Sequence, residues 1–330
     1  MKKYHIYGIG NALVDMEFEV TPEFLGKMNI EKGLMTLVEQ ERQDQLLEHL
    51  DGHQHKRGCG GSAANTVIGA AQMGAKAFYS CKVANDEPGD FYLSDLEALG
   101  VRSNLSGKER ENGVTGKCMV FVTPDADRTM NTYLGITGSF STTELSVDDL
   151  HASEYLYIEG YLVASPTGKQ AAIEAYSEAK KAGVKTAITF SDPGIVAGFK
   201  DGLMQMMGDG VDLLFCNEQE ALAFTGAASV EDAFHQLKDY AKSFAITLGP
   251  KGAKIYDGQE DIEVITSKVD AIDTNGAGDL FAGSFLYAIT SGKSYAEAGR
   301  LACAAASRLV TQFGARLQRD EALEVLNDVF

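Results

Sequence analysis

Short apolar runs alternate with amphipathic segments along most of the chain. Runs rich in β-branched and aromatic residues predict strands, at 4–10, 77–83, 154–160, 185–190, 211–217 and 244–249. Segments with helical periodicity follow them, at 63–74, 89–100, 169–183 and 218–225, and from about 277 and 295. Strands that alternate with helices of this length predict βαβ units. We therefore expect an α/β fold with a mostly parallel sheet, helices on both faces, and ligands beyond the C-terminal strand ends.

Two stretches break this rhythm. Residues 14–38 contain VDMEFEV and GLMTLV, and residues 114–134 contain VTGKCMVFVTPDADRTMNTYL. Both are typical of extended strands, and strands without an intervening helix favour antiparallel pairing. We expect a small β-sheet from these two insertions, inside one domain that covers 1–330. It could act as a lid, or it could be a static extension of the main sheet. The segment 49–58, HLDGHQHKRG, is expected to be a polar loop.

Composition and charge limit the partners and the cellular location that we expect for this protein. The chain has 330 residues, of which 45% are hydrophobic, and its net charge is −18. An acidic chain repels phosphate backbones, so we do not expect nucleic acid as a partner. An anionic ligand would have to be bound by a local arrangement of groups that outweighs the net negative charge. The longest apolar runs are too short to span a membrane, and the N-terminus lacks a signal-peptide pattern. Five cysteines without paired spacing indicate buried thiols in a reducing compartment. We therefore expect a cytoplasmic protein.

The most specific pattern for a catalytic site is the turn DTNGAGD, residues 273–279. Apolar residues at regular spacing after it predict a helix that begins at this turn. Unpaired N–H groups at a helix start, together with the helix dipole, bind anions. A neutral cradle of this kind can hold a phosphate in an acidic protein. Asp279 would then lie where an incoming hydroxyl loses its proton. Alternatively, Asp279 only complements the helix dipole. We expect a weak base, because a helix N-terminus favours the ionised carboxylate.

Several weaker patterns accompany this turn. Gly58–Asn65, GCGGSAAN, opens a helix with paired glycines, although Ser62 could simply be its N-cap. Asp15 follows the first strand in GNALVD and could accept two sugar hydroxyls; GIGNAL lacks the third glycine and the helix of a dinucleotide fingerprint. Asn217 and Glu220 could hold the water ligands of Mg²⁺, or form an ordinary helix cap.

Two further features are weak when taken alone. The turn TLGPKG, residues 247–252, could pack against a nucleotide. Arg128 lies in the second insertion and could reach a phosphate, although most lone arginines are only solvated.

These patterns occur in a fixed order over nearly the whole chain: GN…D, GGSAAN, N-x-x-E, TLGPKG and DTNGAGD. The chain resembles the ribokinase (phosphofructokinase-B) family of sugar and nucleoside kinases, whose most specific signature is matched by DTNGAGDLFAGSF. Within that family it most resembles the adenosine kinase branch, in GNALVD, GGSAANTVIGAAQMG, YIEGYLVASP and VDLLFCNEQEALAF. The resemblance implies a ribokinase-like three-layer αβα sandwich with a mostly parallel central sheet and a small β-sheet lid.

The resemblance also implies roles for individual residues. Asp279 would be the catalytic base for the acceptor hydroxyl, and Gly276, Ala277 and Gly278 would form the anion hole. The other implied contacts are with the substrate hydroxyls (Asn11, Asp15, Gly61, Ser62 and Asn65), with ATP (Asn217, Thr247, Gly249, Gly252, Asn275 and Gly278), with the transferred phosphate (Arg128), with Mg²⁺ through water (Asn217 and Glu220) and with a monovalent cation such as K⁺ (Asp273, with backbone near Asn275 and Gly314).

The expected function is therefore an ATP- and Mg²⁺-dependent kinase that phosphorylates a primary hydroxyl of a nucleoside or sugar, with a purine nucleoside such as adenosine as the expected acceptor. Met35 stands where eukaryotic adenosine kinases carry a glutamine, so the base is the least determined part of the substrate. The alternatives are a free-sugar kinase of the ribokinase or fructokinase type, and a ligand-binding regulator without turnover. An oxidoreductase is disfavoured by the incomplete glycine fingerprint. We expect a monomer or homodimer with small-molecule partners.

Overall fold

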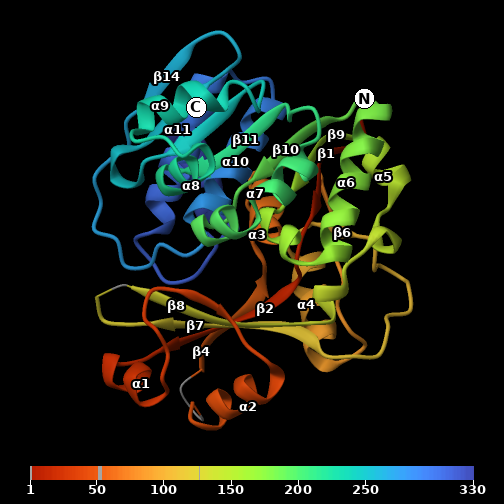
Figure 1. The fold of residues 1–330 in the computed structure, drawn as a ribbon, viewed down its shortest axis with the longest axis vertical. Coiled ribbons are helices and arrows are strands. Elements are labelled where there is room, and N and C mark those ends of the chain that lie inside the picture. Colours follow the sequence, from red (N-terminus) through yellow and green to blue (C-terminus); the bar gives the residue numbers. More distant parts are fainter. Residues whose placement is uncertain (1, 51–53, 126) are drawn as a thin grey trace.

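The computed structural model describes residues 2–50, 54–125 and 127–330, and these residues form two β-sheets (Figure 1). The larger sheet has nine strands in the order β14-β13-β12-β11-β10-β9-β1-β5-β6. In chain order their bounds are β1 (Tyr4–Ile9), β5 (Ala77–Ser80), β6 (Arg102–Ser103), β9 (Ser153–Ile158), β10 (Lys185–Thr189), β11 (Leu213–Asn217), β12 (Phe244–Thr247), β13 (Ala253–Tyr256) and β14 (Asp261–Val264).

The strands from β6 to β12 pair in parallel, and the hairpin of β13 and β14 adds two antiparallel strands at one edge. Strand β1 lies between β5 and β9, so the order in which strands are added reverses at β1: first β5 and β6 on one side, then β9 and the later strands on the other. A reversal of this kind opens a crevice at the carboxyl ends of the central strands. The prediction of a mostly parallel sheet is confirmed.

Helices cover both faces of the larger sheet, because its strands send alternate side chains into two apolar cores. Leu213 and Phe215 of β11 enter one core, whereas Leu214 and Cys216 enter the other. The first core contains residues of α3 (Ser62–Gln72), α4 (Glu87–Ala98), α10 (Ala277–Thr290), α11 (Tyr295–Leu309) and α12 (Arg319–Val329). The second contains residues of α5 (Val147–His151), α6 (Pro166–Lys181), α7 (Pro193–Met207), α8 (Glu218–Thr225) and α9 (Val230–Leu237). The α/β/α sandwich is therefore confirmed.

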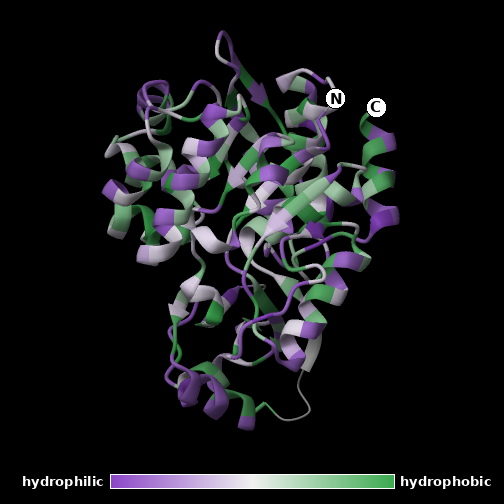
Figure 2. Cartoon of the chain, turned by 90° about the vertical axis from the view of Figure 1, so that its right-hand side faces the viewer, coloured by the Kyte–Doolittle hydropathy of each residue, from purple (hydrophilic) through white to green (hydrophobic). Residues whose placement is uncertain are grey.

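The helical ribbons in Figure 2 change repeatedly between hydrophilic and hydrophobic residues, as expected for helices that bury one side against a sheet. All five cysteines are free and buried. Among the described residues, no helix is both long enough and apolar enough to cross a membrane.

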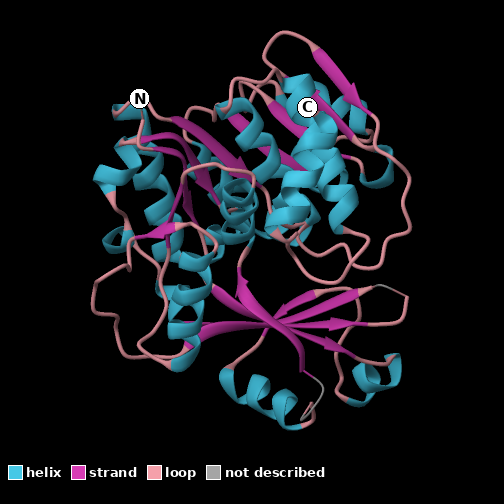
Figure 3. Cartoon of the chain, turned by 180° about the vertical axis from the view of Figure 1, so that it is seen from behind, coloured by secondary structure: helices cyan, strands magenta, loops and turns pink. Residues whose placement is uncertain are grey.

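The small sheet has five strands in the order β3-β8-β7-β2-β4 and lies beyond the carboxyl ends of the central strands (Figures 1 and 3). Its strands are β2 (Leu13–Glu19), β3 (Met35–Leu37), β4 (Gln54–Gly60), β7 (Thr115–Val122) and β8 (Arg128–Gly135). The expectation of antiparallel pairing is only half right. Strands β2–β4 and β7–β8 are antiparallel, but β2–β7 and β3–β8 are parallel. The parallel pairs join strands from different insertions.

Two short helices accompany the small sheet, α1 (Pro22–Lys27) and α2 (Gln40–Glu48), and the pattern reading missed both. They lie on the side away from the large sheet (Figure 3). Together with β2 and β7 they enclose a separate apolar core, which includes Phe18, Leu25, Leu46, Met119 and Phe121.

The expectation of a polar loop at 49–58 is wrong for its second half, which forms β4. Residues 51–53, including His53, lie outside the described residues. The sequence QHKRGCG has no apolar alternation, because this strand forms by pairing with β2. Its glycines leave room for side chains of other elements: a Cβ at Gly60 would overlap the Asp15 carboxylate, and a Cβ at Gly58 would overlap Nη2 of Arg316.

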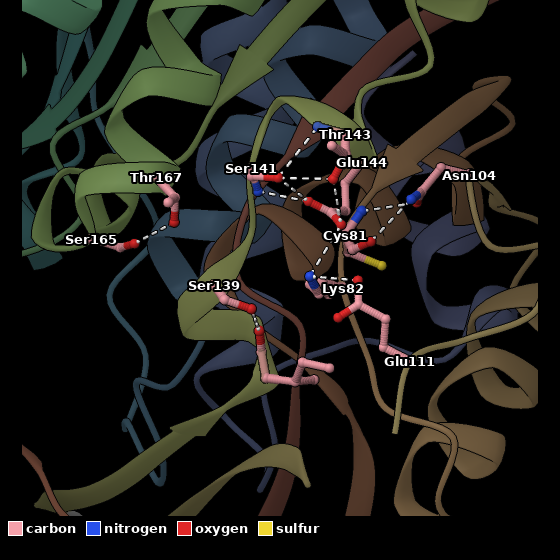
Figure 4. Close-up of polar contacts among 11 residues, drawn as sticks. Cys81, Lys82, Asn104, Glu111, Ser139, Ser141, Thr143, Glu144, Ser165 and Thr167 are labelled. Atoms are coloured by element: carbon pink, nitrogen blue, oxygen red, sulfur yellow. Dashed lines mark hydrogen bonds and ion pairs between the residues drawn. The ribbon is translucent and has the colours of Figure 1, made fainter. Parts of the chain in front are cut away.

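Lys82, which follows β5, contacts residues on both sides of the β7–β8 hairpin (Figure 4). The Lys82 ammonium lies 3.0 Å from Glu111, before β7, and 3.3 Å from Glu144, after β8. Glu144 also caps the 3-10 turn η2 (Thr142–Glu144) by accepting from the N–H and the hydroxyl of Ser141. One buried cation therefore anchors both ends of the β7–β8 hairpin to the end of β5.

Candidate active site

A cavity of about 410 Å³ lies between the carboxyl ends of the large sheet and the small sheet. This volume is in the range of small-molecule sites. It gathers most of the residues singled out from the sequence: Asn11, Asp15, Gly61, Ser62, Asn65, Arg128, Asn217, Glu220, Thr247, Asn275, Gly276, Ala277, Gly278 and Asp279. Three others, Gly249, Gly252 and Asp273, do not line it.

The glycine-rich turn opens helix α10 at the floor of this cavity. Gly276 is the N-cap with φ of +72°, and a Cβ there would overlap the carbonyl of Ala315, so no other residue fits without strain. The first α-helical bond runs from the N–H of Leu280 to Gly276. Within the described residues, the N–H groups of Gly278 and Asp279 have no acceptor. A Cβ at Gly278 would meet only open space. The turn therefore presents unpaired donors to the cavity.

Asp279 is fixed by two donors from helix α3. The hydroxyl of Ser62 donates to Oδ1 at 2.7 Å, and Nδ2 of Asn65 donates to Oδ2 at 3.2 Å. Burial raises the pKa of Asp279 to about 6, although both hydrogen bonds and the charge of Arg128 act to lower it. The expectation of a weak base is therefore wrong, because desolvation outweighs the helix start. A pKa near neutrality suits a general base.

The opening of helix α3 lies directly beside the end of β1. Gly61 has φ of +103°, and a Cβ there would overlap the carbonyl of Asn11, so the two segments touch through backbone. The side-chain NH₂ of Asn11 is engaged by Glu159, and that of Asn65 by Asp279. Oδ1 of Asn65 is buried without a hydrogen-bond partner. Asn65 as a residue lines the cavity, while this acceptor atom is enclosed by protein in the described structure.

Asp15 projects into the cavity from β2. Within the described residues no protein group donates a hydrogen bond to its carboxylate, which leaves both oxygens for a ligand. Burial raises the pKa of Asp15 to about 7, Arg316 lowers it, and Glu17 and Asp279 raise it. An ionised carboxylate in this position can accept two hydroxyl donors.

Glu159 is a buried residue of the site that the sequence reading missed. One of its oxygens accepts from the N–H of Asn11 at 3.1 Å and from its side chain at 2.8 Å; the other accepts from the N–H of Ala63 at 2.8 Å. A Cβ at Gly10 would overlap this carboxylate. Glu159 thus clamps the end of β1 to the start of α3, and burial raises its pKa to about 7. Its position at the end of β9 was the available signal, because charged residues at strand ends line such crevices.

Arg128 reaches from the small sheet onto the glycine-rich turn. It donates to Oδ1 of Asn275 and to the hydroxyl of Thr274, each at 2.9 Å, and its Nε lies 3.2 Å from Asp273. Asp273 is fully buried and also accepts from the N–H groups of Asn275, at 2.8 Å, and Gly314, at 2.9 Å. These donors fill most of its acceptor capacity. The geometry makes Asp273 an anchor of the turn, and Arg128 a cation beside the cradle.

The other end of the cavity is formed at β11 and β12. Asn217 and Glu220 make a reciprocal capping box at the start of α8, so the structure contains the ordinary helix cap that the sequence offered as an alternative. Each oxygen of Glu220 accepts one hydrogen bond from Asn217 and keeps a second lone pair for a metal-bound water. Burial raises the pKa of Glu220 to about 7. Thr247 is the cross-strand partner of Asn217 and lines the same end.

Gly249 and Gly252 shape the turn after β12, both with positive φ, and do not reach the cavity. A Cβ at Gly252 would overlap the carbonyl of Val264. Their contribution in the described structure is to the backbone path that follows Thr247.

The side of the cavity formed by the small sheet is mainly apolar. It is lined by Leu13, Met35, Leu37, Val120, Met130 and Leu134, with Cys118 and Thr132 between them. Thr132 donates its hydroxyl to the Cys118 sulfur at 3.3 Å, which satisfies the hydroxyl within the protein. The acceptor side of the cavity therefore combines carboxylates at its floor with an apolar wall.

Comparison with known proteins agrees with this geometry. The model of the pfkB family carbohydrate kinases matches residues 33–322. The chain belongs to the pfkB family. It is therefore a phosphotransferase that acts on a hydroxyl group. Within this family, it is 30% identical over 308 residues to the adenosine kinase of Saccharomyces cerevisiae, covering 86% of this chain and 88% of the relative.

Two solved structures of bacterial relatives are similar throughout. The adenosine kinase from Sinorhizobium meliloti has 34% identity and a TM-score of 0.91, covering 99% of this chain and 100% of the other. A probable sugar kinase from Rhizobium etli CFN 42 has 33% identity and a TM-score of 0.92, and each chain is covered completely. The similarity supports the adenosine kinase-like branch of the pfkB family.

Proposed function

We propose that this protein is an ATP-dependent kinase that transfers the γ-phosphoryl group to the primary hydroxyl of a purine nucleoside such as adenosine. The observation that carries the choice of acceptor is the apolar wall of the small sheet, which lines the same cavity as Asp15 and Asn65. A flat base gains stability from burial against such a wall. A free sugar would leave several hydroxyls facing it without partners.

Substrate binding would begin at the carboxylate of Asp15, which lines the cavity and accepts the two secondary hydroxyls of the ribose. Gly61 and Asn11 shape the floor, and Glu159 holds Asn11 and Ala63, which follows Gly61 and Ser62, in place. This arrangement directs the primary hydroxyl of the ribose toward Asp279.

Asp279 then takes the proton of that hydroxyl as it attacks. Ser62 and Asn65 orient its two oxygens, and burial keeps it basic enough to accept the proton near neutral pH. Catalysis of phosphoryl transfer depends mostly on positioning and on charge neutralisation. The unpaired N–H groups at the start of α10 and the guanidinium of Arg128 supply that neutralisation. The turn and Arg128 must therefore be in place together.

The nucleotide would lie along the β11 and β12 end of the cavity. Asn217, Thr247 and Asn275 border this space, and Gly249 and Gly252 set the path of the turn behind it. Glu220 and Asn217 would hold the waters of Mg²⁺, which neutralises phosphate charge when bound. Asp273 anchors the turn through three donors, and its contact with a monovalent cation such as K⁺ stays a prediction. The need for ATP fits a cytoplasmic enzyme.

The small sheet would act as a lid over the acceptor. Its strands contribute Arg128, Asp15 and the apolar wall to one cavity, while Lys82 anchors its junction with the large sheet. A free-sugar kinase is the alternative enzyme. The intact base and cradle favour an enzyme over a regulator.

The test is an acceptor panel with ATP and Mg²⁺. Adenosine, inosine, guanosine, cytidine, ribose and fructose are compared by ADP release, and the products are identified by mass spectrometry. We expect the highest kcat/KM with a purine nucleoside and a product phosphorylated at its primary hydroxyl. Turnover restricted to free sugars would refute the nucleoside assignment. Tight nucleoside binding without turnover would refute the kinase assignment.

A further inference from the structure

Arg316 is a nearly buried cation outside the glycine-rich turn and outside every motif that the sequence analysis singled out. It lies in the segment between α11 and α12, two residues beyond Gly314, which donates to Asp273. Its Nη1 donates to the Cys59 sulfur at 3.2 Å, and its Nη2 donates to Asp95 of α4 at 3.3 Å. The side chain is 17% exposed, so it is not a solvated surface arginine.

The register of the small sheet places this guanidinium next to Asp15, outside the larger cavity. Asp15 and Gly58 are direct partners in the antiparallel pair of β2 and β4. Directly paired residues send their side chains to the same face of a sheet. A Cβ on Gly58 would overlap Nη2 of Arg316, so the guanidinium occupies the space where a side chain at position 58 would stand. It therefore lies beside the Asp15 carboxylate, and both residues line one cavity of about 20 Å³.

We infer that Arg316 is a positioning residue for the acceptor: its guanidinium, next to Asp15 on the paired strand, favours the ionised carboxylate that receives the ribose hydroxyls. The inference rests on the proposed function, because it takes Asp15 as the hydroxyl contact. It adds a residue to the site from the C-terminal segment. That segment then serves both halves of the site, since Ala315 packs against Gly276 and Arg316 faces Asp15.

The surroundings of Asp15 show why a cation is needed there. Asp15 faces acidic groups from two elements, Glu17 on its own strand and Asp279 on α10. The thiol of Cys118 on β7 and the phenol of Tyr92 on α4 also face it, and both are neutral because burial raises their pKa values. Arg316 is the cation that opposes this environment and lowers the pKa of Asp15, which burial otherwise raises to about 7. Asp95 holds the guanidinium from its other side.

The first experiment measures Asp15 directly, so that it does not depend on turnover. Carbon-13 labelled aspartate carboxyls are titrated by NMR in the wild type, Arg316→Gln and Arg316→Lys, and the Asp15 signal is assigned with Asp15→Asn. We expect the midpoint to rise by about one pH unit in Arg316→Gln and to stay near the wild-type value in Arg316→Lys. Gly58→Ala should raise it as well, because the added Cβ displaces the guanidinium, and it provides a second variant if Arg316→Gln fails to fold.

The second experiment measures kcat/KM for the acceptor between pH 6 and pH 9. A carboxylate whose pKa rises by one unit has about one-tenth of its ionised fraction at low pH and the same fraction at high pH. Arg316→Gln should therefore lose about tenfold in kcat/KM at pH 6 and approach the wild type at pH 9, with KM for ATP unchanged. Arg57→Gln is the matched control, because Arg57 lies on the same strand but pairs with Glu87.

Two results would overturn the inference. One is an Asp15 midpoint that does not move in Arg316→Gln or Gly58→Ala. The other is an equal loss of kcat/KM at every pH, which a merely structural role would produce. Failure of the proposed function is seen separately: the wild type would phosphorylate no acceptor, while the NMR midpoints would still report whether Arg316 controls Asp15.

Discussion

The ligand-free protein should become more stable when the pH falls from 8 to 6, contrary to the usual effect of acid. Burial raises the pKa of Glu159 and of Glu220 to about 7. Both carboxyls are at most 4% exposed. In the unfolded chain such groups titrate near pH 4. The folded form therefore binds these protons more tightly, so stability is gained as the pH falls through 7 and is lost again as it rises.

The size of this change in stability follows from the difference between the folded and unfolded pKa values. Between pH 8 and pH 6, one carboxyl with a folded pKa of about 7 contributes between about 1 and 2 kcal/mol to the free energy of unfolding. Glu159 and Glu220 together give about 3 kcal/mol, and Asp15, whose pKa is also raised to about 7, acts in the same direction. The effect is large against a typical total stability of roughly 5–15 kcal/mol.

The assay is urea unfolding at pH 8, 7 and 6 at constant ionic strength, followed by circular dichroism and tyrosine fluorescence, since the chain has no tryptophan. Asp15→Asn should reduce the gain by about 1 kcal/mol, because one titrating group is removed. Asp149→Asn is the control, because the pKa of Asp149 is lowered and lies outside this range. A free energy of unfolding that is flat or falls from pH 8 to pH 6 would refute the reasoning.

Three substitutions test the catalytic machinery. Asp279→Asn should lower kcat at least about 10²-fold while ATP affinity, measured by calorimetry, is kept; near wild-type turnover would remove Asp279 from the role of base. Gly276→Ala should lower stability by roughly 1–3 kcal/mol in thermal unfolding, because its Cβ overlaps Ala315, and unchanged stability would contradict the steric argument. Arg128→Gln should reduce kcat about tenfold or more, whereas a change confined to KM for the acceptor would assign Arg128 to binding alone.

The sequence predicts the larger sheet well because its strands are short, apolar and separated by helices of clear periodicity. The expected strand at 77–83 and helix at 63–74 correspond to β5 and α3 within a few residues. The polar strand β4 was missed because it owes its conformation to pairing with β2 and to side chains that fill the space above its glycines. Tertiary context of this kind overrides local propensity.

In the candidate site, too, local patterns were predictable from the sequence and tertiary contacts were not. The glycine-rich turn marks the cradle, because small residues at a helix start leave a recognisable pattern. Glu159 and Arg316 carry no comparable pattern, since each acts through residues distant in sequence: Glu159 holds Asn11 and Ala63, and Arg316 lies beside Asp15. The pKa of Asp279 also depends on burial by the whole cavity, which outweighs the local helix start.

The separate apolar core of the small sheet, around Phe18 and Phe121, has a consequence for how heat inactivates the enzyme. A unit with its own core can open at a lower free energy than the whole molecule. Heating would then detach Asp15 and Arg128 from the cavity while Glu220 and Asp279 stay ordered in the large sandwich. Acceptor binding would disappear before most of the secondary structure melts, and proteases would first cut within the small sheet. Inactivation and unfolding would be two events at two temperatures.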